Sequence, residues 1–83
     1  MSEDFFNEII TNVIFLVNNE FQKLRLKMIT RSDIELFFLE DTIGIQINID
    51  LKQSKKSILN NRLIKISMEI QEKYSVPGFR VVC

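Results

Sequence analysis

The chain has 83 residues, 46% of them hydrophobic, and its 11 basic and 11 acidic side chains give a net charge of zero. This length predicts a single domain spanning residues 1–83 with one core, and the hydrophobic content excludes a disordered chain. A net charge of zero excludes the overall positive field that is typical of nucleic-acid-binding proteins, and it permits self-association.

The charges are unevenly distributed along the chain. Residues 1–50 hold nine acids and four bases, whereas residues 51–83 hold seven bases and two acids. In one interpretation the two halves neutralise each other within the fold. In the other they form a polarised surface for head-to-tail pairing or for an acidic partner.

The composition restricts the available chemistry. The chain has no His, and its single cysteine is Cys83, so catalysis by a Ser–His or Cys–His pair is impossible and a zinc site lacks ligands. Gly44 and Gly78 stand alone and form no glycine-rich phosphate loop. The adjacent Glu40 and Asp41 could hold a cation, but we interpret them as a solvated hairpin turn. We therefore predict a protein that is not an enzyme and has no cofactor or metal.

The same composition predicts a cytoplasmic location. A single cysteine allows no intrachain disulfide, which is typical of a reducing compartment. The first four residues are acidic rather than basic, unlike a signal peptide. The apolar run at 9–17 is shorter than the roughly 20 residues of a membrane span, so no membrane partner is expected.

Apolar residues first recur at helical spacing from Phe5 to Val17, which predicts a helix. Ser2 is suited to cap its start, and Asn18 and Asn19 are suited to its end.

Three segments with alternating apolar and polar residues follow, at 21–29, 34–40 and 43–51. A period of two is typical of strands with one buried and one solvated face. The alternation is clearest in the third segment, where isoleucine occupies every second position from Ile43 to Ile49. Because the intervening turns are short, we predict an antiparallel meander.

A second helix is predicted at 55–74, with Ser54 as its cap, and Pro77 prevents its continuation. Residues 79–83 are then expected to add a short strand at a sheet edge. The predicted fold class is α+β with two layers in the order α-β-β-β-α-β. Both helices cover the isoleucine-rich face of the sheet, and the opposite face is left for solvent or a partner.

That free face provides the first candidate binding surface. If the strand assignments hold, two apolar side chains of the second strand and three basic side chains of the first strand point outward together. They would form an apolar anchor with a cationic flank for a protein partner, especially an acidic one. The alternatives are a register shift of one residue or a fourth strand that covers the aromatic ring. The predicted partner-binding residues are Phe37, Leu39, Lys23, Arg25 and Lys27.

A second candidate surface lies on the predicted second helix. Ile64 and Met68 lie opposite its core stripe and, four residues apart, contact one another. Such an exposed apolar pair indicates an interface, and we predict a homodimer seam. The two surfaces together favour a non-catalytic protein-binding module of the inhibitor, immunity or adaptor type, as small phage and mobile-element proteins often are.

Nucleic-acid binding is the alternative. A basic cluster surrounds the start of the second helix, where phosphates can also meet free backbone amides. Ser54-Lys55-Lys56 and the order of elements resemble a double-stranded-RNA-binding domain. Residues 57–61 lack the Ala-rich stretch of that family and a tight turn replaces its loop between the first two strands, so we do not assign the chain to it. The candidate residues are Lys52, Lys55, Lys56, Arg62 and Lys65.

Overall fold

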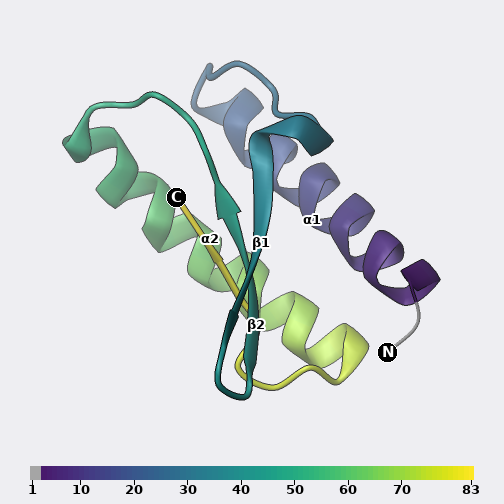
Figure 1. The fold of residues 1–83 in the computed structure, drawn as a ribbon. Helices are drawn as coiled ribbons and strands as arrows, with labels where there is room; N and C mark the ends of the chain where they lie inside the picture. Colours follow the sequence, from purple (N-terminus) through teal and green to yellow (C-terminus); the bar gives the residue numbers. More distant parts are fainter. Residues whose placement is uncertain (1–2) are drawn as a thin grey trace.

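The computed structural model describes residues 3–83, apart from the side chain of Leu39. Ser2, the predicted cap of the first helix, lies outside the described residues. In chain order the elements are α1 (Glu3–Lys23), a 3-10 turn η1 (Arg31–Asp33), β1 (Ile34–Leu39), β2 (Thr42–Ile47), α2 (Gln53–Tyr74) and β3 (Arg80–Val82) (Figure 1).

The three strands form one sheet in the order β1-β2-β3. β1 and β2 are an antiparallel hairpin in which Ile34 lies opposite Ile47. β3 joins the other side of β2 in parallel orientation, with Val81 opposite Ile45. The prediction of a short C-terminal strand at the sheet edge is confirmed, whereas the meander is limited to the β1–β2 hairpin.

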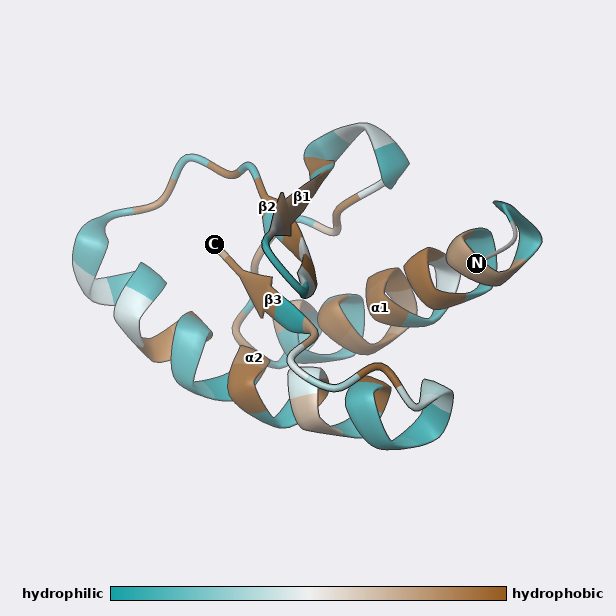
Figure 2. Ribbon diagram, turned by 60° about the horizontal axis from the view of Figure 1, so that its bottom comes forward, coloured by the Kyte–Doolittle hydropathy of each residue, from teal (hydrophilic) through white to brown (hydrophobic). Residues whose placement is uncertain are grey.

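Both helices pack on one face of this sheet (Figure 2), so the predicted two-layer α+β fold is confirmed. They run in opposite directions. Near the start of α1, the Phe5 ring meets the Tyr74 ring edge-on with centroids 5.6 Å apart. Near the end of α1, Glu20 accepts a hydrogen bond of 2.7 Å from Arg62 of α2.

The core lies between the two layers. Ile45 and Ile47 are fully buried, as the isoleucine ladder predicts, whereas Ile49 is only half-buried because β2 ends at Ile47. α1 contributes an apolar stripe at four-residue spacing, and α2 contributes a matching stripe. The helical core residues are Ile9, Ile10, Val13, Val17, Phe21, Leu59, Leu63, Ile66 and Ile70.

The predicted strand at 21–29 is wrong. Residues 21–23 belong to α1, and residues 24–30 form no strand. α1 continues past Asn18 and Asn19 because this adds a further turn to its apolar stripe and buries Phe21. It ends in a Schellman motif, in which the amide of Leu26 donates to the carbonyl of Phe21 (2.8 Å) and Arg25 takes a left-handed φ of 57°.

Asn18 accounts for the path of the segment that follows α1. Its buried side chain accepts a hydrogen bond from the Ile29 amide (2.8 Å) and donates one to the Ile29 carbonyl (3.0 Å). One asparagine therefore provides the pair of bonds that a neighbouring strand would otherwise provide. It anchors the returning chain against α1 rather than against the sheet.

Candidate functional site

The sheet face that points away from the helices is open within residues 3–83 (Figure 2). The strand register arranges its side chains in two rows across the sheet. One row is Glu35, Gln46 and Val82, and the other is Phe37, Gly44 and Arg80.

On this open face Phe37 projects from the edge strand β1, and its ring lies over Gly44 of the central strand β2. The Phe37 ring occupies the space that a Cβ at Gly44 would fill, so any side chain at residue 44 would overlap it. An aromatic ring that covers a glycine across a strand pair is a known device for stabilising sheets. It explains the glycine in the strand interior. The ring is half-buried against the backbone, which fixes it as a flat apolar platform.

Two charged side chains lie on the same face. Arg80 is exposed on β3, on the far side of Gly44 from Phe37, and Glu35 is exposed on β1. The sequence analysis did not identify Arg80 as a site residue. The sequence shows only a basic residue, Arg80, followed by the apolar Val81. A strand of three residues is too short for this pattern to fix its register at the edge of a sheet.

The prediction that Lys23, Arg25 and Lys27 share this face with Phe37 is wrong, because residues 24–30 are not part of the sheet. Lys23 ends α1 and pairs with Glu20 at 3.4 Å. Arg25 belongs to the motif that ends the helix. Lys27 lines a separate hollow between residues 26–29 and 48–51. Any part they take in partner binding stays a prediction. Leu39 pairs with Thr42 at the end of β1, and its side chain lies outside the described atoms.

A second surface lies on α2, beside β3. Ile64 is 56% exposed and Met68 is 61% exposed. They line a groove between α2 and β3, together with Arg80 and Val82 of the strand. The structure therefore places the two seam residues on the surface, where the helical spacing located them.

The outer edge of β3 is occupied by side chains of α2. The Ser67 hydroxyl accepts a hydrogen bond from the Val81 amide (2.9 Å) and Asn60 accepts one from the Cys83 amide (3.0 Å). Gln71 donates to the Phe79 carbonyl at 2.7 Å. Covering an edge in this way prevents pairing with a strand of another chain, so a partner would meet side chains in this groove.

The basic cluster surrounds the start of α2, but its cap is not the predicted one. Lys52 occupies the N-cap position, and Ser54 is inside the helix. Among the described atoms no side chain caps this terminus, and the first turn of α2 holds no acid. Lys55 and Lys56 follow in that turn.

Arg62 and Lys65 are separate from this terminus. They line a groove between α1 and α2, where Arg62 is engaged by Glu20. The hydrogen bond from the Arg62 guanidinium holds the pKa of the Glu20 carboxyl below its ordinary value. The five predicted nucleic-acid-binding residues therefore form two groups.

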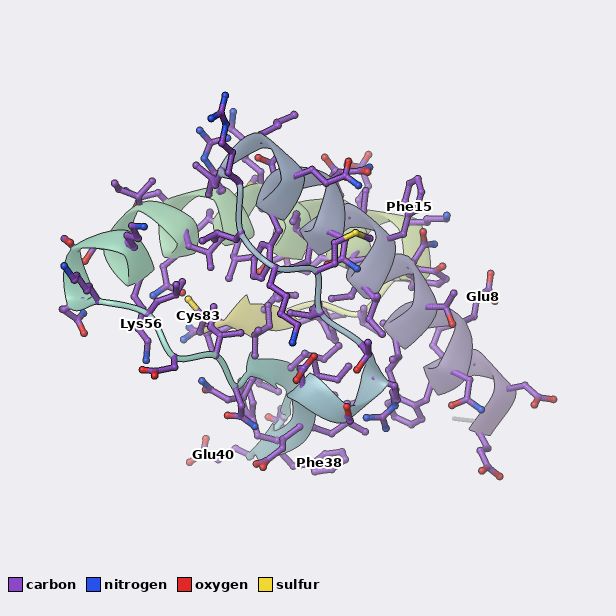
Figure 3. The ribbon with its side chains drawn as sticks, turned by 90° about the horizontal axis from the view of Figure 1, so that it is seen from above. Glu8, Phe15, Phe38, Glu40, Lys56 and Cys83 are labelled. Atoms are coloured by element: carbon purple, nitrogen blue, oxygen red, sulfur yellow. The ribbon has the colours of Figure 1, made fainter. Side chains whose placement is uncertain are left out.

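Cys83 lies beside the first turns of α2, near Lys56 (Figure 3). Its Sγ is 3.5 Å from the Asn60 Oδ1 atom. Burial raises the pKa of the thiol above its ordinary value, so the reactive thiolate is scarce at neutral pH.

Two further aromatic side chains are exposed at other places (Figure 3). Phe15, on α1, is 63% exposed and lies opposite the buried stripe of that helix. Phe38 is 66% exposed, although it alternates with Ile34 and Leu36 and so lies on the same side of β1 as these core residues. It lies at the end of β1, next to the hairpin turn of Glu40 and Asp41.

Across residues 3–83, no three Cys, Asp or Glu side chains gather closely enough to hold a metal ion. No helix in that range is long and apolar enough to cross a membrane. No family model matches the sequence, and neither a curated protein nor a solved structure matches the chain.

Proposed function

We propose that the chain is a non-catalytic protein-binding module that docks its partner on the open face of the sheet, with Phe37 as the apolar anchor. The observation that supports this most is the Phe37 ring, which is partly buried over Gly44 and keeps part of its surface open to solvent. A rigid aromatic side chain loses little conformational entropy on binding, which is why such residues dominate interface energetics.

The charges around Phe37 define the partner further. Arg80 and Glu35 are exposed in different rows of the face, so an acid of the partner is expected near Arg80 and a base near Glu35. Paired charges at the rim contribute more to specificity than to affinity. With Lys23, Arg25 and Lys27 away from the sheet, the case for an acidic partner is limited to Arg80.

We further propose that the module acts by occupying a surface of its partner, as inhibitors, immunity proteins and adaptors do, and that it does so in the cytoplasm. The single cysteine, Cys83, is free and half-buried, so the fold contains no disulfide. A fold without a disulfide is compatible with a reducing compartment such as the cytoplasm.

The test is affinity capture of the tagged chain from its native cells, followed by measurement of binding to the captured protein. Phe37→Ala is expected to weaken binding at least tenfold, roughly the effect of losing an interface hot spot. Phe38→Ala is the matched control, because Phe38 is the adjacent residue, is more exposed and points to the other side of β1. Equal effects of the two variants, with circular dichroism unchanged, would exclude the open face.

Nucleic-acid binding is a second candidate, supported by the uncapped and acid-free first turn of α2 beside Lys52, Lys55 and Lys56. This candidate requires an affinity that falls steeply with salt, since bound phosphates release counterions. A mobility shift at low salt that Lys55→Glu weakens would favour it. The matched control is Lys73→Glu at the far end of α2, and the absence of any shift at low salt would exclude this candidate.

A further inference from the structure

We infer that the face of α2 bearing Ile64 and Met68 binds a second copy of this chain across a two-fold axis, with the two α2 helices antiparallel. This face borders the α2–β3 groove and does not include Phe37. A homodimer formed there leaves the Phe37 rings of both copies free for the proposed partner.

The first argument is apolar exposure. Ile64 and Met68 are more than half exposed, lie one turn apart on the helix and continue into the groove beside Val82. Contiguous apolar surface of this kind is typically covered by a partner. Each copy provides the same pair, so one two-fold contact covers all four side chains.

The second argument is the absence of charge on this face of α2. At about 100° per residue, the side chains within about 40° of the middle of the Ile64 and Met68 pair are uncharged, and the first charged side chains on this side of α2 are Glu72 and Lys65 at its border. Residues near a two-fold axis approach their own copies, so a charge there would meet a like charge. These uncharged neighbours are Ser57, Asn61, Gln71 and Ser75.

The third argument is the position of the charges at the border of this face. Lys65 precedes Met68 by three residues and Glu72 follows it by four, and both are exposed. Seven residues span nearly two whole turns of a helix, so Lys65 and Glu72 lie on the same flank. An antiparallel pair that crosses at Met68 reverses the residue order. Lys65 of each copy then faces Glu72 of the other, giving two ion pairs.

The sealed edge of β3 restricts a contact at this groove to side chains. Because Asn60, Ser67 and Gln71 already bond the outer backbone groups of β3, two copies cannot extend their sheets through this edge. The side chains at the groove can still pack against each other. Side-chain packing through one helix buries less area than a standard interface of about 800 Å² per partner, so the dimer is expected to be weak.

Sedimentation equilibrium of the full chain over a range of concentrations tests the inference. We expect a concentration-dependent monomer–dimer equilibrium rather than a single species. Met68→Lys should weaken it at least about tenfold, because it brings two like charges together at the axis. Phe15→Lys is the matched control, since Phe15 is equally exposed but lies on α1, and it should leave the equilibrium unchanged.

Charge exchange tests the orientation. Lys65→Glu and Glu72→Lys should each weaken the dimer several-fold, and the double variant should restore it, since the exchanged pair meets again across the axis. Both positions are exposed, and circular dichroism checks that each variant stays helical. A wild-type chain that is monomeric at several hundred micromolar would overturn the inference, as would a dimer insensitive to Met68→Lys. A double variant no better than the single variants would also overturn it. None of these outcomes affects the proposal for Phe37.

Discussion

Two segments of this chain carry nearly the same alternating pattern, yet only one becomes a strand. In residues 43–51 the apolar positions point into the core, and β2 pairs with a strand on each side. In residues 24–27 burial also alternates, since Leu24 and Leu26 pack against the core while Arg25 and Lys27 are exposed, but the order reverses at exposed Met28 and buried Ile29. The difference lies in the hydrogen-bond partner. The backbone of Ile29 bonds to the Asn18 side chain instead of to a strand.

Alternation therefore indicates only part of the burial, because Met28 and Phe38 are exposed at positions that it assigns to the core. It does not indicate which groups satisfy the backbone. Every buried amide and carbonyl requires a partner, and a polar side chain of a neighbouring helix can provide it. The four predictions that follow test this point, beginning with the largest expected effect.

The largest expected difference lies between a fully buried position of β2 and a half-exposed position of residues 21–29. Ile45→Ala should lower the free energy of unfolding by about 3–4 kcal/mol, because it leaves a cavity where the side chain is fully buried. Met28→Ala, at a half-exposed position of the other segment, should cost less than about 0.5 kcal/mol. Urea unfolding measures both values. If Ile45→Ala does not fold, Ile45→Val should still cost about 1 kcal/mol. Similar costs for Met28→Ala and Ile45→Val would mean that the two segments are equally buried.

The next prediction concerns Asn18. Asn18→Ala should cost about 2–4 kcal/mol, because it leaves both backbone groups of the buried Ile29 without a partner. Hydrogen exchange should show the Ile29 amide losing its protection before the amides of β2 do. Asn19→Ala, at the exposed neighbouring residue, is the control and should change little. Unchanged protection at Ile29 would mean that the segment has another anchor.

Much of the fold is local enough to predict from the sequence. The hairpin follows from two alternating segments joined by a short turn, and α2 follows from its apolar stripe and from Pro77. The end of α1 was not predicted because its left-handed residue is Arg25 rather than a glycine. The pairing of Asn18 with Ile29 was not predicted because a single buried asparagine leaves no repeating signal.

The candidate site was only partly predictable for the same reason. Phe37 and the pair Ile64 and Met68 follow from periodicity within single elements. Arg80 joins Phe37 only through the parallel register of β3. The role of Gly44 becomes visible only when the ring that covers it is known. Contacts between elements that are distant in sequence therefore cannot be predicted from the periodicity of a single element.

Ser67 of α2 bonds the backbone of β3 at the sheet edge, as Asn18 of α1 bonds the backbone of Ile29. Its removal is expected to have a smaller effect on stability than the removal of Asn18. Its buried hydroxyl donates to the Leu63 carbonyl and accepts from the Val81 amide. Ser67→Ala should cost about 1–2 kcal/mol, because the Val81 amide loses its acceptor. Ser57→Ala, at an exposed position of the same helix, should be nearly neutral. Thermal unfolding compares the two variants, and equal melting temperatures would show that β3 does not depend on α2 for this bond.

Replacement of Arg25 by glycine is expected to have the smallest effect, and it should stabilise the protein rather than destabilise it. A non-glycine residue with a φ of 57° is strained, so Arg25→Gly should raise the free energy of unfolding by about 0.5–1 kcal/mol. Lys27→Gly, two residues further on, gains no such relief and should be neutral or slightly destabilising through the added freedom of the unfolded chain. Urea unfolding of the two variants gives the sign of each change. If Arg25→Gly destabilised the protein as much as Lys27→Gly, residue 25 would not require a left-handed conformation. The Schellman motif would then not be what ends α1 before the chain turns back to Asn18.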